Sequence, residues 1–334
     1  MSDPSNHLSP APSPAPARNQ RRWIRLAIGL PILAVVWWLV IGRLVESFAE
    51  LDWSSLRIGW PLVGLSILAL LCARLTNALN CRQVLGAMGQ SIGASRVVPI
   101  IWVASLGRYV PGKFAVVAGA AGMLVRLGVR LPVALAALFL STALMILIGL
   151  VASMPLLFAL PTLREKLPGA PAIALAGAAA GALCLHPAVF TRLCNVLLRR
   201  LKRQPLPERL VLGPFLRAVG MTVLRTMFLG LALWCAVRSL DPTITLASYP
   251  LALGSAGLAS CIGFLAIFAP AGLGVHEAVY LLTVGAVLGP AAAVLVVLFR
   301  FLNILVDALT GAVGLAMFRL QHDWERGVNA AVDR

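Results

Sequence analysis

Apolar residues occur along most of this 334-residue chain in long uninterrupted runs, instead of the short periodic clusters of water-soluble domains. A helix needs about 20 apolar residues to cross a bilayer. Runs of roughly that length lie at residues 24–44, 59–80, 132–153, 171–188, 214–237 and 292–317. The pattern therefore predicts an all-α, polytopic membrane helix bundle with at least six spans.

Two further apolar regions are interrupted by proline and glycine. At 97–125 two short apolar pieces flank RYVPGK, and at 246–289 the run is broken by Pro270, Gly272 and Gly274. Non-helical backbone at membrane depth is tolerated only where protein or a water-filled cavity covers it. We predict a re-entrant hairpin at 97–125 and either a second hairpin or two spans at 246–289. This gives six to eight transmembrane helices with two broken or re-entrant segments.

The two broken regions suggest an internal inverted repeat. Each follows an apolar helix with one central arginine, Arg74 before the first break and Arg225 before the second. Broken helices in corresponding halves typically frame the midplane site of inverted-repeat transporters. A helix that starts just after such a break has free N–H groups and a positive dipole end, which favour an anion.

Composition and charge agree with a membrane protein. The chain is 60% hydrophobic and only 12% charged, far from the values usual for soluble domains. The formal net charge of +16 would suggest nucleic acid in a soluble protein. Here the basic residues stand in short loops beside apolar runs, so no nucleic-acid partner is expected. The strongest basic loop, 192–209, and both chain ends are predicted to be cytoplasmic.

The ends of the chain are expected to be polar tails around one transmembrane domain over residues 21–320. Residues 1–20 are rich in Pro, Ser and Ala and are predicted to be disordered. Residues 321–334 are predicted to form a cytoplasmic C-terminal tail. The stretch after residue 20 resembles a signal peptide, but its apolar run is long enough to cross the bilayer, which favours a retained first span.

Ionisable residues inside apolar runs are the candidates for chemistry, because a charge at a helix centre costs about 2.5–3.5 kcal/mol on insertion scales. Arg300, Asn303 and Asp307 share one helix face at i, i+3 and i+7, and Arg74 and Asn77 share another. We predict a basic pocket for a phosphate-bearing lipid head group. Its predicted ligand-binding residues are Arg74, Asn77, Arg108, Pro111, Gly112, Lys113, Arg225, Pro270, Gly272, Gly274, Glu277, Arg300, Asn303 and Asp307.

Structural interpretations of the same residues stay open. Arg300 could pair with Asp307 or Glu277 as a contact between helices. Arg108 and Lys113 could be anchors whose side chains reach the cytoplasmic surface. The six cysteines and four histidines show no ligand spacing, so no metal and no cofactor are predicted.

The motifs YVPGKF…GMLVRLGV and PAGLGVHEA…LFRFLNILVDALTGAVG resemble the lysylphosphatidylglycerol synthase transmembrane family, also called flippase-like membrane proteins. The resemblance spans roughly residues 20–320. It implies a multi-helix protein of the bacterial inner membrane that handles phospholipid or polyprenyl-phosphate head groups. The soluble aminoacyltransferase domain of fused relatives is expected to be absent. After Lys113 the chain lacks the acidic residue and arginine of many relatives, which argues against an aminoacylated cargo.

Together these patterns predict a non-enzymatic integral membrane protein that binds and translocates an anionic phospholipid or polyprenyl-phosphate-linked lipid through a basic midplane cavity. The alternative is an accessory subunit that presents lipid to a separate glycosyl- or aminoacyl-transferase. A third hypothesis is a membrane-embedded transferase with Glu277 or Asp307 as base. His276 beside Glu277 is not expected to form a catalytic pair, because adjacent helix residues point in different directions.

Overall fold

The computed structural model describes residues 42, 58–109, 114–159, 169–200, 205, 210–266 and 272–332. The predicted N-terminal tail and nearly all of the predicted span at 24–44 lie outside these ranges. Four predicted ligand residues also lie outside them, namely Pro111, Gly112, Lys113 and Pro270.

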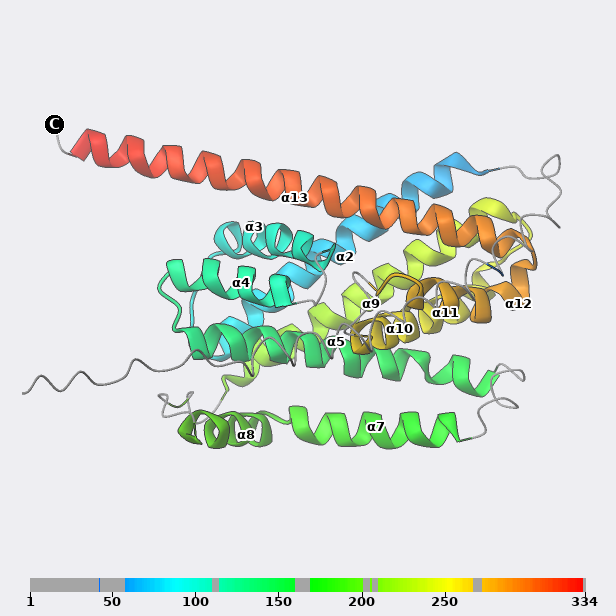
Figure 1. Ribbon diagram of the computed structural model, residues 1–334, viewed down its shortest axis with the longest axis horizontal. Coiled ribbons are helices and arrows are strands. Elements are labelled where there is room, and N and C mark those ends of the chain that lie inside the picture. Colours follow the sequence, from blue (N-terminus) through cyan, green and yellow to red (C-terminus); the bar gives the residue numbers. More distant parts are fainter. Residues whose placement is uncertain are drawn as a thin grey trace, which may run out of the picture.

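Every secondary-structure element in the described part of the chain is helical. The first half contains α2 (Trp60–Ala87), α3 (Ala94–Ser105), the 3₁₀ turn η1 (Leu106–Tyr109), α4 (Phe114–Arg126) and α5 (Leu131–Ala159). The second half contains α9 (Leu212–Leu240), η2 (Leu246–Ser248), α10 (Tyr249–Leu265), α11 (Val275–Thr283), α12 (Gly285–Leu288) and α13 (Ala291–Val332). Between them lie α7 (Ala170–Leu185) and α8 (Pro187–Arg200), as Figure 1 shows.

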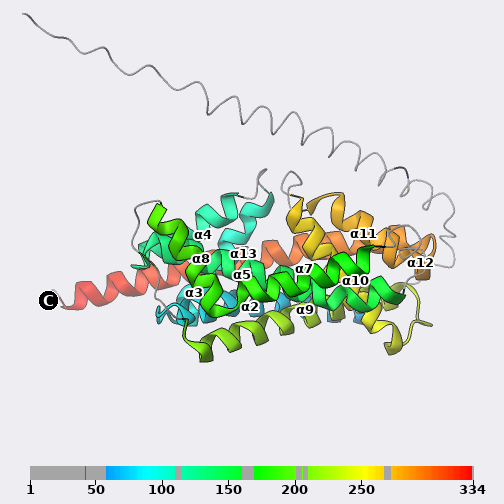
Figure 2. The same cartoon turned by 90° about the horizontal axis from the view of Figure 1, so that it is seen from below.

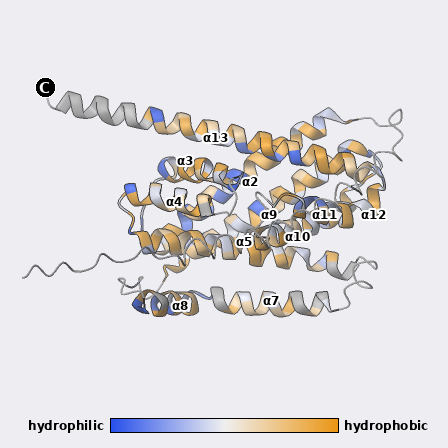
Figure 3. Ribbon diagram, viewed as in Figure 1, coloured by the Kyte–Doolittle hydropathy of each residue, from blue (hydrophilic) through white to orange (hydrophobic). Residues whose placement is uncertain are grey.

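Five of the described helices are long and apolar enough to cross a membrane: Trp60–Ala87, Leu131–Leu156, Leu212–Leu240, Leu246–Leu265 and Ala291–Leu320. The pair α7 and α8 would give a sixth if counted as one span, although the two helices are bent by 73°. Hydrophobic residues dominate the long helices (Figure 3). These findings confirm the predicted polytopic helical membrane bundle.

Prolines mark where several of these helices begin. α2, α7 and α10 each have a proline at the first or second helical position, where its missing N–H has no intrahelical partner to lose and its fixed φ suits a helix. α2 continues past the predicted end at residue 80. Its polar last turns are stabilised by contacts, since Asn80 donates to the Ala218 carbonyl at 2.9 Å and Arg82 donates to the Ile92 carbonyl at 3.1 Å.

The two halves share one order of elements: a long helix, a broken segment and another long helix. α2 and α9 pack against each other as an antiparallel pair. At one end the Gly59 N–H donates to the Ser239 carbonyl at 2.7 Å, and at the other the Val211 N–H donates to the Ala87 carbonyl at 2.8 Å. The centre of α2 therefore lies opposite the centre of α9.

Each broken segment packs against the last long helix of the other half. α3 packs on α13, and α10 packs on α5. Figures 1 and 2 both place α4 toward one end of the long axis and α11 toward the other. Gly314 of α13 faces α3 and Gly311 faces Leu106 of η1, while Gly149 of α5 faces Gly257 of α10. Small residues let helix backbones approach closely in a bilayer, where no hydrophobic effect drives helices together. The packing of each broken segment against the other half agrees with the predicted inverted repeat.

Two apolar cores occupy the two ends of the bundle. One contains Leu85, Leu124 and Leu140 and gathers residues of α2, α3, α4, α5 and the start of α9. The other contains Leu233 and Val306 and gathers residues of α2, α9, α10, α11 and α13. The buried polar residues in the middle of the helix bundle lie between these two cores.

The prediction of a loop from residue 192 is wrong for its first part, because α8 extends to Arg200. Phe190, Cys194 and Leu198 recur at i, i+4 and i+8 and pack against the first core. This helical pattern of apolar residues covers only a few positions and is interrupted by arginines. The charge of the segment therefore hides the helix from a prediction based on apolar runs.

We expect Gly257→Ala to destabilise the protein. A Cβ at residue 257 would lie 2.6 Å from the Gly149 carbonyl oxygen, so α5 and α10 would have to separate, and overpacking of this kind costs about 1–3 kcal/mol. The measurement is the thermal unfolding midpoint of the purified protein in detergent. Gly220→Ala on α9, where a Cβ meets open space, is the matched control. Equal midpoints for both variants would contradict the close helix contact.

Candidate functional site

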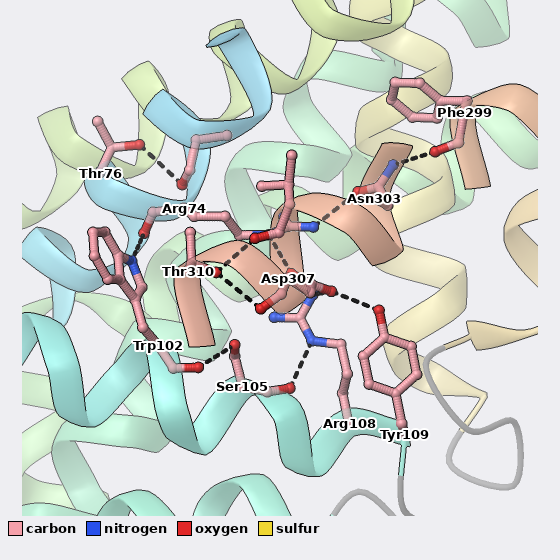
Figure 4. A network of polar contacts seen from close by, with 12 residues as sticks. Arg74, Thr76, Trp102, Ser105, Arg108, Tyr109, Phe299, Asn303, Asp307 and Thr310 are labelled. Atoms are coloured by element: carbon pink, nitrogen blue, oxygen red, sulfur yellow. Dashed lines mark hydrogen bonds and ion pairs between the residues drawn. The ribbon is translucent and has the colours of Figure 1, made fainter. Parts of the chain in front are cut away.

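Polar side chains of α2 and α13 meet at the centre of the bundle (Figure 4). Arg74 donates from Nε to Asp307 Oδ1 at 2.7 Å and from Nη2 to Asn303 Oδ1 at 2.8 Å. Arg74 and Asp307 are both buried. The predicted polar face of α13 therefore does lie on one side of that helix, and it is turned toward α2.

A second cation shares the Asp307 carboxylate. Arg108 of η1 places Nη1 3.2 Å from Asp307 Oδ2, and the Tyr109 hydroxyl donates to the same oxygen at 2.8 Å. Arg108 Nε also donates to the Ser105 carbonyl at 3.0 Å. Burying a carboxylate is tolerated only when its charge is paired and its lone pairs are bonded. These contacts fix η1, which directly precedes the first break, to α13.

The second break supplies a second ion pair to α13. Gly272 and Gly274 have φ of 69° and 81°, a region that glycine adopts without steric cost, and α11 begins directly after them. Glu277 stands in the first turn of α11, where the positive helix dipole end favours a carboxylate. Its Oε1 lies 3.4 Å from Arg300 Nη1, and its buried Oε2 has no hydrogen-bond partner among the described residues.

Arg225 of α9 lies opposite Arg74. On one side of Arg74 along α2, Ser66 donates to the Ala232 carbonyl of α9, and on the other side Asn80 donates to the Ala218 carbonyl. Arg225 lies between these two carbonyls along α9, so the two arginines stand at the same height in the antiparallel helix pair. Arg74, Arg108 and Arg300 each have a carboxylate partner. Within the described part of the chain, the Arg225 side chain has neither an ion-pair partner nor a hydrogen-bond partner.

These groups line one cavity of about 100 Å³. Its lining contains four arginines and two carboxylates, which leave two formal positive charges inside low-dielectric walls, where charges act strongly. The lining residues are Arg74, Arg108, Tyr109, Arg225, Leu229, Ser260, His276, Glu277, Tyr280, Val296, Phe299, Arg300, Asn303 and Asp307.

The structure places the predicted ligand residues as follows. Every predicted charged residue in the described part of the chain lines the cavity, together with Asn303. Asn77 is only half-buried on α2 and does not line it. Gly272 and Gly274 shape the second break. Pro111, Gly112, Lys113 and Pro270 lie outside the described residues, and their binding roles stay predictions.

The structure also decides between the alternatives for the charges. Arg300 pairs with Glu277, one of the two partners expected for it, while Asp307 pairs with Arg74 and Arg108. Arg108 lines the cavity and is paired with a buried carboxylate, a position that favours the cavity role over that of a surface anchor.

Several cavity residues were missed by the sequence-based selection. Tyr109 directly follows a selected arginine, and this adjacency is the one available signal for it. His276 occupies a narrow space between Gly263 of α10 and Gly272, because a Cβ on either glycine would overlap its imidazole. Its ring meets Tyr280 edge-on, with ring centroids 6.4 Å apart. No sequence pattern indicated this space, since it arises from packing between α10 and the second break.

Five apolar spans, one of which (Leu246–Leu265) belongs to the second broken segment, and a central basic cavity define a multi-pass α-helical membrane protein. The family model for the lysylphosphatidylglycerol synthase TM region matches residues 22–330. The chain therefore belongs to the lysylphosphatidylglycerol synthase transmembrane-region family, which confirms the resemblance carried by its two motifs. Comparison with curated proteins gave no match.

We expect Asp307→Asn to destabilise the protein strongly, because Arg74 would be left buried without a countercharge. Breaking a buried ion pair from one side costs about 3–5 kcal/mol, whereas replacing both partners is often nearly neutral. The thermal midpoint in detergent should therefore fall for Asp307→Asn and recover in part when Arg74→Gln is added. No recovery in the double variant would show that the ion pair is not the source of the loss.

Gly263→Ala should displace His276 and lower stability by about 1–3 kcal/mol, as expected for overpacking. A double-mutant cycle with His276→Ala tests the cause, because removal of the imidazole should relieve most of the cost. Thermal midpoints of the two single variants and the double variant provide the measurement. Additive losses would contradict the direct contact.

Proposed function

We propose that this protein binds an anionic phospholipid or a polyprenyl-phosphate-linked lipid by its head group in the central cavity and moves it between the leaflets. The proposal rests on Arg225, which lines the cavity and whose guanidinium has no ion-pair or hydrogen-bond partner in the described part of the chain. An uncompensated charge at this depth is costly. Arginine binds phosphate through two parallel hydrogen bonds, so a lipid phosphate would supply the missing countercharge.

The rest of the lining fits a head group with a second functional group. The cavity keeps two formal positive charges after its internal pairs are counted, which favours an anion over a neutral group. Glu277 Oε2 is a buried acceptor without a partner among the described residues. A hydroxyl or amine of the head group could donate to it and remove the cost of an unsatisfied carboxylate oxygen.

The arrangement of the two halves suggests how a head group would move. Both broken segments are tied to α13 by charge, the first through Arg108 and Asp307 and the second through Glu277 and Arg300. A phosphate in the cavity competes with Asp307 for Arg108, whose side chain is 31% exposed. Weakening this pair would free the first broken segment from α13, consistent with the rocking of repeats in inverted-repeat transporters.

The distribution of basic residues supports an orientation in the membrane. Arg96 at the start of α3, Arg126 at the end of α4 and Arg130 before α5 lie at the end of the bundle that also holds α8. Short cytoplasmic loops carry an excess of such residues. We therefore propose that this end faces the cytoplasm and that the membrane is the bacterial inner membrane.

Binding without catalysis is the proposed role of the cavity. Both of its carboxylates are paired with arginines, which disfavours either as a general base. The alternative function is an accessory subunit that presents bound lipid to a separate glycosyl- or aminoacyl-transferase. That role needs the same lipid site but no movement between leaflets.

Lipid movement can be measured in proteoliposomes with acyl-labelled phosphatidylglycerol or polyprenyl phosphate and dithionite quenching of the outer leaflet. The wild type should accelerate exchange over empty liposomes. Arg225→Gln should weaken head-group binding roughly 10- to 100-fold, because a hydrogen bond to a charged group is worth about 1.5–3 kcal/mol. Arg238→Gln, which removes a cation stacked on Trp234 in the last turn of α9, is the matched control.

Mass spectrometry of co-purified lipid separates the two functions. Enriched anionic lipid that is lost in Arg225→Gln, without accelerated exchange for either probe, would favour the accessory subunit. Equal, bulk-like lipid in the wild type and the variant would overturn the cavity as a lipid site.

A further inference from the structure

α8 has an outward face that the cavity does not use. Its inward face carries Phe190, Cys194 and Leu198 and packs against the first core. On the opposite face Arg192, Val196 and Arg199 recur at i, i+4 and i+7 and are exposed. Arginine and apolar side chains thus share one surface of α8 that is exposed in the described part of the chain.

The direction of α8 separates it from the spanning helices. α7 packs along α5, one of the five spans, and α8, which begins at Pro187, is bent from α7 by 73° at the break between the two helices. α8 therefore turns from the direction of the spans toward the plane of the membrane. Its 14 residues include three arginines, and at about 2.5–3.5 kcal/mol each such a segment is not stable in the hydrocarbon.

The described side chains at the end of the bundle that holds α8 include more arginines than carboxylates. Within the described side chains the carboxylates are Asp241 at the other end of α9 and the cavity residues Glu277 and Asp307. Arg126 ends α4 and Arg130 precedes α5, and both flank residues of the first core, on which α8 packs. The outward face of α8 thus complements an anionic surface with both charge and apolar area.

We propose that α8 is an interfacial helix that docks on the anionic phospholipids of the membrane the protein spans. Leu193 and Val196, which are 55% and 51% exposed, enter the boundary between head groups and acyl chains. Arg192, Arg199 and Arg200 bind the lipid phosphates above them. Amphipathic helices with basic residues bind membrane surfaces in this way. This site is separate from the cavity and does not depend on lipid movement through it.

Photo-crosslinking of the full chain in its membrane tests the occupant. Benzoylphenylalanine at Val196 should yield lipid adducts in which phosphatidylglycerol and cardiolipin are enriched over their share of the bulk lipid. Each arginine near an anionic leaflet is worth about 1 kcal/mol, so each Arg→Gln change should lower the enrichment up to roughly fivefold. The same probe at Leu183 of α7, 66% exposed, should report bulk proportions.

The controls keep the outcome decisive. Changing Arg192, Arg199 and Arg200 together to Gln should bring the adducts to bulk proportions, while changing them to Lys should preserve the enrichment and exclude a folding defect. A soluble protein as the main adduct at Val196 would overturn the proposal in favour of a protein partner. Bulk proportions in the wild type would overturn it as well, because the helix would then have no preference for anionic lipid.

Discussion

The buried carboxylate of Asp307 is the interaction on which the centre of this protein depends. In a low-dielectric interior it requires compensation, and it receives Arg74 from α2 and both Arg108 and Tyr109 from η1. One side chain of α13 thereby fixes a spanning helix and a broken segment. Arg300, two turns earlier on the same helix, fixes the second broken segment through Glu277.

The two halves of the chain match in the order of their helices and differ in their charges. α5 occupies in the first half the place that α13 occupies in the second, yet its sequence has no charged residue. Arg74 and Arg225 occupy matching central positions, yet the Asp307 carboxylate of α13 pairs with Arg74 and not with Arg225. The uneven distribution leaves Arg225 facing the cavity without a carboxylate partner in the described part of the chain. Such a site favours an anionic group that comes from outside the protein.

Close helix packing makes this electrostatic centre possible. Gly314 and Gly311 bring α13 near α3 and η1, and Gly257 brings α10 near Gly149 of α5. Since apolar surface gains little by leaving lipid, such contacts rely on dispersion and backbone proximity. They bring segments from opposite halves together at one level of the bundle, with an apolar core on each side.

The sequence by itself determined the spanning helices, the two breaks, the polar face of α13 and the family, because these depend on local apolar length, helical period and short motifs. It also selected the charges that line the cavity, since charge within apolar runs is rare. Only the tertiary structure decided that Asp307 pairs with Arg74 and Arg108, that Asn77 lies apart and that His276 fits between two glycines. Those outcomes depend on how helices distant in sequence rotate and cross, and no local pattern of residues encodes that geometry.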